Sequence, residues 1–399
     1  MTAAVHDDAV AISAEIAELR HAIHRDPEIG LDLPRTQRKV LDALSGLPLE
    51  ISRGKSLSSV TAVLRGSKPG RTVLLRGDMD ALPVTERTGV PYASQVDGAM
   101  HACGHDLHTA MLAGAARLLS ARQAELAGNV IFMFQPGEEG LGGARHMIDE
   151  GVLDAAGERP VAAFGLHVAS GLLPLGITTS RAGTMMAAAD TLHVTVRGRG
   201  GHASQPHRAS DPIPAACEIV IALQTMVTRR FDVFDPVVIT VGTFHAGTTD
   251  NVIPDEAHFV ATIRSFSPAA RTAVQDAAPR LARDIASAHG LTADAEYVDG
   301  YPVTVNDGTE LAFAEQTIAE ALGGGRFVTT PDPLTGSEDF SFVLEQVPGA
   351  FIMLGACAPG ADPATAPFNH SAEAVFDDAA LADGTALYAE LALRRLVAG

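Results

Sequence analysis

The sequence predicts an α/β protein with a mainly parallel sheet and helices on both faces, plus an inserted ferredoxin-like α+β domain. Three observations support this prediction. Short apolar runs, typical of strands buried on both faces, alternate with helical segments in the first part of the chain. From about residue 184 the strands instead alternate apolar and polar residues, in the order β-α-β-β-α-β. After residue 298 the first pattern returns, as expected for an insertion.

Length and composition agree with two domains and a sizeable core. The chain has 399 residues, of which 46% are hydrophobic. We expect residues 1–183 and 299–399 to form the larger domain and residues 184–298 to form the inserted one.

The charge balance excludes several classes of partner. Lys and Arg total 29 against 48 Asp and Glu, a formal net charge of −19. This charge repels nucleic acids and anionic membranes, so neither is an expected partner. The sequence has no run of eighteen apolar residues, and residues 1–8 lack the pattern of a secretion signal, so we expect a soluble cytoplasmic protein. Three scattered cysteines, Cys103, Cys217 and Cys357, fit a reducing compartment, with Cys217 interpreted as a core residue.

The elements of the larger domain follow from apolar periodicity and breaker residues. The helices show the 3.6-residue period and are expected at about 9–25, 36–44, 107–119, 309–322 and 378–396. The strands are short apolar runs at 73–75, 130–134, 161–166 and 350–354.

The inserted domain is expected to contain four strands and two helices. Its strands are expected at 191–196, 237–241, 257–263 and 293–298, and its helices at 211–228 and 268–289.

The segment Met100–His108 contains one cysteine and three histidines within nine residues, just before a predicted helix. Asp106 stands where an N-cap would, so Cys103 and His105 are expected in the tight turn that enters the helix. A thiolate and an imidazole separated by Gly104 suit zinc or another transition metal. By itself the segment also fits a nucleophilic cysteine or an inert buried thiol.

Polar residues follow three of the predicted buried strands. Asp78 and Asp80 follow the first, Glu138 and Glu139 the second, and His167 the third. Ligands in open α/β sheets bind outside the carboxyl ends of the strands, so these side chains are expected to share one crevice. Taken singly, each also fits an ordinary loop carboxylate or a hydrogen-bonded core histidine. Their common position favours a metal site, with Asp80 orienting a metal-bound imidazole.

Eight ordered motifs resemble the aminoacylase and carboxypeptidase G family of dinuclear metallohydrolases. The resemblance is closest to the amidohydrolase branch, which includes hippurate hydrolase, auxin-conjugate hydrolase and other N-acyl-amino-acid amidohydrolases. The matching motifs are Gly77–Pro83, Met100–His108, Gln135–Gly140, Gly165–His167, Gly201–Pro206, Asn251–Pro254, Ser337–Phe340 and Asn369–Ser371.

The resemblance implies two divalent metal ions per subunit, and sulfur, nitrogen and carboxylate ligands accommodate zinc, manganese, cobalt or nickel. It implies the metal ligands Cys103, His105, Glu139, His167 and His370, with Cys103 as the bridge. Most of the wider family has a histidine where this chain has Asp78 and an aspartate as the bridging ligand. This departure leaves open whether Asp78 contacts a metal.

The resemblance also implies the reaction and its other residues. Glu138 is the implied general base as a metal-activated water attacks the amide of an N-acyl amino acid, releasing a carboxylate and a free amino acid. His202 is the implied oxyanion donor, supplied by the inserted lid domain to the partner subunit of a homodimer, or of a tetramer. Asn251 and Arg264 are implied substrate contacts, and an arginine suits a carboxylate.

Other functions remain open at this stage. Within the family, the protein could be a dipeptidase or a deacetylase. A second hypothesis makes Cys103 a nucleophile paired with His105, and a third is a binding protein without catalytic activity. The sequence does not identify the acyl group, the amino acid or the metal.

Overall fold

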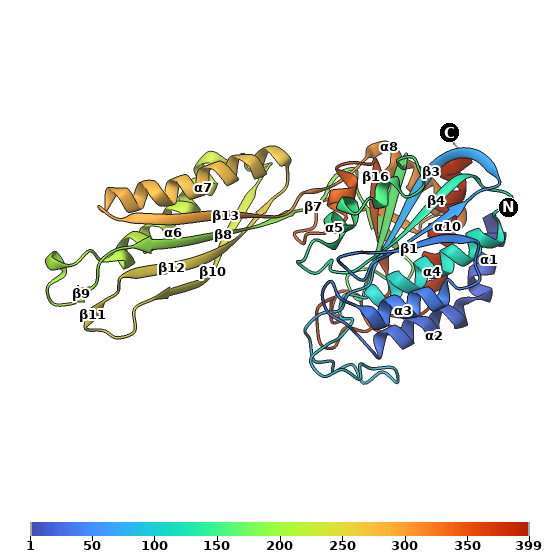
Figure 1. Cartoon of the computed structure of the whole chain (residues 1–399), viewed down its shortest axis with the longest axis horizontal. Coiled ribbons are helices and arrows are strands. Elements are labelled where there is room, and N and C mark those ends of the chain that lie inside the picture. Colours follow the sequence, from blue (N-terminus) through green and yellow to red (C-terminus); the bar gives the residue numbers. More distant parts are fainter. Residues whose placement is uncertain (1, 398–399) are drawn as a thin grey trace. The chain divides into compact units, whose positions relative to one another are not determined.

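The computed structural model describes residues 2–397, which form two compact units (Figure 1). The first unit contains the residues up to Met185, then Val305–Asp332, and those from Asp339 onward. The second unit contains Met186–Thr304 and Pro333–Glu338. Relative to the expected range 184–298, the second unit begins at residue 186 and also includes residues 299–304 and 333–338.

The first unit is built on an eight-stranded mixed sheet in the order β1-β2-β4-β3-β5-β16-β6-β15. The four central strands, β4, β3, β5 and β16, are parallel, whereas β1 and β2 add an antiparallel edge. Their bounds are β1 Leu49–Arg53, β2 Val60–Arg65, β3 Lys68–Asp78, β4 Ala127–Gln135, β5 Ala162–Ala169, β6 Thr178–Ser180, β15 Phe327–Thr329 and β16 Gly349–Gly355. Short strands β7 (Gly183–Met186) and β14 (Thr304–Asn306) pair separately.

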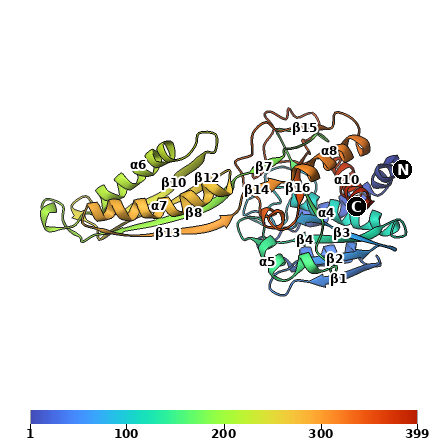
Figure 2. The ribbon, with the colours of Figure 1, turned by 90° about the horizontal axis from the view of Figure 1, so that it is seen from above.

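Helices cover the sheet of the first unit (Figure 2). Helices α4 (His105–Ala121) and α10 (Ala380–Val397) contact the central strands and each other, while the short α5 (Gly143–Asp149) contacts β4. The remaining helices are α1 Thr2–Ala11, α2 Ser13–His24, α3 Pro34–Ala43, the 3₁₀ turn η1 Val152–Asp154, α8 Gly308–Ala321 and α9 Ser341–Leu344. Within residues 2–397, no helix combines the length and apolarity needed to cross a bilayer.

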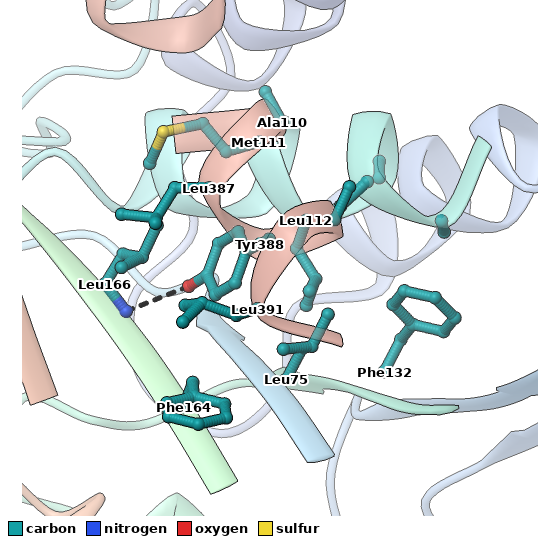
Figure 3. Packing of buried hydrophobic residues seen from close by; sticks show 14 of the residues in the cluster. Leu75, Ala110, Met111, Leu112, Phe132, Phe164, Leu166, Leu387, Tyr388 and Leu391 are labelled. Atoms are coloured by element: carbon teal, nitrogen blue, oxygen red, sulfur yellow. Dashed lines mark hydrogen bonds between the residues drawn. The ribbon is translucent and has the colours of Figure 1, made fainter. Parts of the chain in front are cut away.

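The core of the first unit lies between the sheet and helices α4 and α10 (Figure 3). Phe132 and Phe164 from the strands and Leu112 from α4 are fully buried there, and each such side chain contributes about 1.5–3 kcal/mol. The Tyr388 hydroxyl on α10 accepts a hydrogen bond from the Leu166 amide at 3.0 Å and donates one to the Arg76 carbonyl. Since the β3–β5 ladder ends near Arg76, this hydroxyl joins the two strands where they begin to separate.

The second unit is a four-stranded antiparallel sheet in the order β10-β12-β8-β13, with α6 and α7 on one face. Chain order and sheet order together are ferredoxin-like. The elements are β8 Ala188–Arg197, α6 Pro212–Arg230, β10 Val237–Ala246, β12 Glu256–Ser265, α7 Pro268–Ala288 and β13 Thr292–Tyr301. Two-residue strands β9 (Gly201–His202) and β11 (Val252–Ile253) pair beside the 3₁₀ turn η2 (Pro206–Arg208). Alternate residues of β8 are buried against the helices, which explains the period of two.

Four local expectations were wrong. The predicted helix 9–25 is divided at Ile12 into α1 and α2. Helix α4 begins at His105 with Gly104 as its N-cap, because Gly104 adopts a left-handed conformation that ends the preceding turn; Asp106 therefore lies in the first helical turn. His167 lies within β5 rather than after it. Cys217 is exposed on α6 and is not a core residue.

His24 on α2 is buried among carboxylates and attaches this helix to α4. Its Nδ1 lies 2.8 Å from Asp106 Oδ2, and its Nε2 lies 3.3 Å from a Glu86 carboxylate oxygen. Burial alone would lower the pKa of His24, but the Asp106 and Glu86 carboxylates outweigh it and raise this pKa to about 9.

We expect this ion pair to make stability depend on pH. A histidine whose pKa rises from 6.5 to about 9 on folding stabilises fully below pH 6.5, and the stabilisation, about 3 kcal/mol, is lost as pH rises through 9. The melting temperature of the metal-free protein should therefore fall more steeply between pH 6.5 and 9.5 than that of His24→Gln. His245→Gln, at an exposed position, is the control and should follow the native protein. Parallel curves for the native protein and His24→Gln would contradict this assignment.

Candidate metal centre

The first unit brings together five metal-ligand candidates from five separate segments. They come from the turn before α4, the start of α4, the loop after β4, strand β5 and the loop before α10; in that order they are Cys103, His105, Glu139, His167 and His370. Nitrogen, sulfur and oxygen atoms of these residues form groups of three within 4.8 Å, namely Cys103-His105-His167, Cys103-Glu139-His370 and, with Glu138, His105-Glu138-Glu139.

Cys103 lies at the centre of the cluster. Its sulfur is 3.4 Å from His167 Nε2 and 3.2 Å from His370 Nε2. The same nitrogen of His370 is 3.2 Å from Glu139 Oε1. Cys103 is therefore shared by two of the three-residue groups, one with His105 and His167 and one with Glu139 and His370.

The His167 imidazole is held in one tautomer. Its Nδ1 lies 2.9 Å from the Val168 carbonyl oxygen, which only accepts, so Nδ1 carries the proton. Burial and the neighbouring His108 ring hold the pKa of His167 well below its usual value. The ring is therefore neutral, with the free electron pair of Nε2 directed toward Cys103, the form that binds metals.

The turn between Cys103 and His105 requires glycine. Gly104 has φ of +82°, and a Cβ there would lie 2.3 Å from Val168 Cγ2 and 3.0 Å from the Phe376 ring. Any side chain would displace the turn, because such contacts are shorter than van der Waals distances. Packing around Gly104 therefore fixes the backbone positions from which the Cys103 and His105 side chains extend.

The unpaired ring nitrogens of His105 fit a site for a cation. Its ring is fully buried, yet neither ring nitrogen has a hydrogen-bond partner among the described residues. Its Nε2 is 3.5 Å from Asp78 Oδ2 and 4.0 Å from Glu139 Oε1. An unsatisfied buried polar group costs about 1–3 kcal/mol, and a metal ion among these atoms would remove that cost.

The electrostatics of the cluster also favour a positive ion. Hydrogen bonds to Cys103 and Glu139 raise the pKa of His370 to about 10. Burial alone would lower the pKa of His105, but the Asp78 carboxylate outweighs it and raises this pKa well above its usual value. Surroundings that stabilise a proton on these imidazoles also stabilise a metal cation.

Asp80 connects the loop after β4 to His105. Its two carboxylate oxygens accept hydrogen bonds from the Glu138 and Glu139 amides, both at 3.0 Å. Its Oδ1 is also 3.6 Å from His105 Nδ1. Asp80 thus fixes the backbone of the two glutamates, and its carboxylate approaches Nδ1 of His105, whereas the Glu139 carboxylate approaches Nε2.

Asp78 is already neutralised by other residues of the first unit. Its carboxylate accepts from Arg76 Nη1 at 2.7 Å and from His108 Nδ1 at 2.5 Å, and all three side chains are fully buried. Burial alone would raise the pKa of Asp78, but Arg76 and the nearby imidazoles hold it well below its usual value. The Asp78 carboxylate therefore supports His108 and approaches His105 without being left unpaired.

Two residues at the site were missed by the sequence reasoning. Both ring nitrogens of His108 are hydrogen-bonded: Nε2 accepts from the Val168 amide at 2.8 Å, and Nδ1 donates to Asp78. Asn369 donates to the Cys103 carbonyl at 3.2 Å and to the Val168 carbonyl at 2.9 Å. His108 lies three residues after His105 and Asn369 directly precedes His370, and this proximity to ligand candidates was the available signal.

The other residues implied by the resemblance lie in the second unit. His202 is exposed on β9, where its Nδ1 accepts from the Ser204 amide at 3.2 Å. Asn251 is exposed just before β11. Arg264 lies half-buried on β12, 3.5 Å from the Ser337 hydroxyl, and forms no ion pair among the described residues.

Comparison with known proteins assigns the family. The sequence profile of Peptidase family M20/M25/M40 matches residues 74–394. Thermostable carboxypeptidase 2 of Saccharolobus solfataricus is 37% identical over 97% of this chain and 97% of its own length. N-acetylcysteine deacetylase of Bacillus subtilis is 37% identical over 96% of this chain and 97% of its own length.

Solved structures agree with the sequence comparison. A dinuclear metal binding peptidase of the M20 family from Bacillus subtilis superimposes with a TM-score of 0.83 and 34% identity, covering 97% of this chain and 99% of that one. The fold, the motif order and the clustered ligand candidates therefore have one common explanation: the chain belongs to peptidase family M20/M25/M40 and is a hydrolase of that family.

Proposed function

We propose that this protein hydrolyses the amide bond of N-acyl amino acids with two divalent metal ions. The observation that carries the proposal is the position of the Cys103 sulfur, 3.4 Å from His167 and 3.2 Å from His370. These residues are remote in sequence, and they converge on a thiol that is buried. The Bacillus subtilis relative that removes acetyl groups from N-acetylcysteine supports the substrate class.

The proposed ligands are Cys103, His105, Glu139, His167 and His370. Their mixture of sulfur, nitrogen and oxygen donors suits zinc, manganese, cobalt or nickel. Two bound ions would lower the pKa of a water and polarise the amide carbonyl.

Glu138 is the proposed general base. It is almost completely buried, and its amide is fixed by Asp80, so the carboxylate starts from a defined position beside Glu139. The Glu138 carboxylate takes a proton from water as the water oxygen attacks the amide carbon. The same carboxyl group then gives that proton to the departing nitrogen as the C–N bond breaks, which leaves a carboxylic acid and a free amino acid.

Asp80 is the proposed positioning residue for His105. Since His105 Nε2 faces Glu139 and Nδ1 faces Asp80, ligation through Nε2 would leave the Nδ1 proton to be donated to the Asp80 carboxylate. A carboxylate behind a ligating histidine fixes its ring and increases its basicity.

Arg264 is the proposed site for the substrate's carboxylate. Burial lowers the pKa of its guanidinium, and the absence of an ion pair among the described residues leaves its forked donors available. A planar guanidinium binds a carboxylate through two parallel hydrogen bonds. Asn251 is the proposed second polar contact with the substrate.

His202 is the proposed oxyanion donor, contributed across a homodimer. Since the Ser204 amide donates to His202 Nδ1, the neutral ring carries its proton on Nε2, where it can be donated to an oxyanion. The second unit would then serve as lid and dimerisation domain, and a monomer would be inactive.

The direct test is a substrate panel assayed on protein reconstituted with each of the four metals. We expect release of free amino acid from N-acetyl, N-benzoyl or indoleacetyl amino acids, with complete loss after chelation and recovery when metal is restored. Dipeptides and short peptides belong in the panel, because the Saccharolobus relative is named a carboxypeptidase. Metal-loaded protein that cleaves none of these amides would contradict the proposal.

Arg264→Gln tests the recognition of the carboxylate. A charge-assisted pair is worth about 1.5–3 kcal/mol, so KM for the best N-acyl amino acid should rise about 10- to 100-fold with little change in kcat. The matched substrate is the same compound with its carboxylate converted to an amide, and the two proteins should hydrolyse it equally. An equal effect of the substitution on both substrates would exclude carboxylate binding by Arg264.

A further inference from the structure

A buried arginine on α2 contacts three other segments of the first unit. The Arg20 side chain is almost completely buried. Its Nε donates to Asp106 Oδ2 at 2.7 Å, and its Nη1 donates to Asp378 Oδ1 and to the Tyr92 hydroxyl, both at 2.7 Å. The guanidinium carbon also lies 4.5 Å above the centre of the Tyr92 ring. One cation therefore joins α2 to α4, to the loop that carries Tyr92 and to the loop before α10.

Two of these segments carry proposed metal ligands. Asp106 directly follows His105 in the first turn of α4. Asp378 belongs to the loop that contains His370, and Nη1 of Arg20 also reaches the Phe376 carbonyl of that loop at 3.4 Å. Movement of Arg20 would therefore displace both the start of α4, which carries His105, and the loop that carries His370.

The start of α4 has little other polar support, whereas the His370 loop is also held by His21, whose Nε2 lies 2.8 Å from Asp378 Oδ2, and by the hydrogen bonds of Asn369. The N-cap of α4, Gly104, offers no side-chain cap to the first turn. Asp106 is fully buried, and its Oδ1 has no hydrogen-bond partner among the described residues, so its charge depends on Arg20 and His24. His370 has φ of +73°, a conformation that a non-glycine residue keeps only where its surroundings enforce it.

We propose that Arg20 is a positioning residue of the metal centre, which sets α4 and the His370 loop at the spacing that metal binding needs. The inference rests on the proposed function, because it assumes that Cys103, His105 and His370 are ligands. Arg20 contacts none of them. It acts through Asp106 on the start of α4, and through Asp378 and Phe376 on the loop of His370. Such preorganisation lowers the free energy that is needed to bring the ligands into place when the ion binds.

Calorimetric titration of the metal-free protein with Mn²⁺ tests the inference. For Arg20→Gln we expect the Kd for Mn²⁺ to rise about 10- to 100-fold, the usual effect of removing support behind metal ligands. Arg20→Lys keeps the charge but not the forked geometry, so its Kd should fall between those of the native protein and Arg20→Gln.

Arg271→Gln is the matched control for a general loss of stability. Arg271 pairs with buried Asp190 through two contacts of 2.7 and 3.0 Å, but both residues belong to the second unit. Both Arg→Gln variants should melt at lower temperature, whereas the Kd for Mn²⁺ should stay within about twofold of native in Arg271→Gln alone. This pattern separates positioning from stability.

Asp378→Asn provides a second route if Arg20→Gln does not fold. The Asp378 side chain is partly exposed, so its neutralisation is milder, and it should raise the Kd for Mn²⁺ in the same direction. A Kd within twofold of native in Asp378→Asn and in any folded Arg20 variant would overturn the inference. A native protein that binds no Mn²⁺, Zn²⁺, Co²⁺ or Ni²⁺ would instead contradict the proposed function.

Discussion

Glu138→Gln is expected to lower kcat by about 10²- to 10⁴-fold while the protein keeps its fold and both metal ions. The amide of glutamine has nearly the shape of the carboxylate but cannot accept a proton from water. Because Glu138 is almost completely buried, bulk solvent should not replace it efficiently. Steady-state kinetics on the best N-acyl amino acid, with metal content measured on the same sample, checks this expectation.

The neighbouring glutamate provides the contrast. Glu139 approaches His370 at 3.2 Å and is a proposed ligand, so Glu139→Gln should lose metal as well as activity. Glu150→Gln, at the end of α5, is a control that should leave both unchanged. If Glu138→Gln kept native turnover, another residue would have to be the general base.

Apolar periodicity predicted the long elements well because burial dictates it. Strands β3, β4, β5 and β16 were found as apolar runs, since they lie at the centre of the sheet with both faces covered. Strands β1 and β2, at the antiparallel edge, were missed. Most of β1 is exposed, so it has no apolar run to reveal it. The three-residue strands β6 and β15 are too short to show a period.

Residue type and position pointed to Cys103, His105, Glu139 and His167 as candidate ligands, and the resemblance added His370, but the network behind them was not predicted. A cysteine, histidines and a glutamate pair beside apolar strands are visible in one sequence. The pairing of Arg20 with Asp106 joins residues 86 positions apart, and no local pattern encodes such a contact. Arg76 is similar: it looks like a break in an apolar strand, yet it is fully buried because Asp78 and Asp339 neutralise it.

Cys103→Ala is expected to remove metal binding and, with it, at least about 10³-fold of the activity, because the thiolate is the proposed bridge between the two ions. Its sulfur is the atom that both His167 and His370 approach, so its loss separates the two sides of the cluster. Metal content after dialysis, together with amidase activity, measures both effects. The Cys217→Ala variant, which removes an exposed thiol in the second unit, should behave like the native protein.

Cys103→Asp separates a bridging ligand from a nucleophile. An aspartate can bridge two metal ions, as it does in the wider family that the sequence resembles, so this variant should recover part of the metal content and activity lost in Cys103→Ala. A cysteine nucleophile predicts the opposite: Cys103→Ala would keep its metal, Cys103→Asp would stay inactive, and chelators would not inhibit the native enzyme. Bound metal should also protect the native thiol from alkylation, because a coordinated thiolate is a poorer nucleophile than a free one. Recovery of hydrolysis by a carboxylate at position 103 would therefore assign Cys103 to the metals, since an aspartate in its place cannot form a thioester.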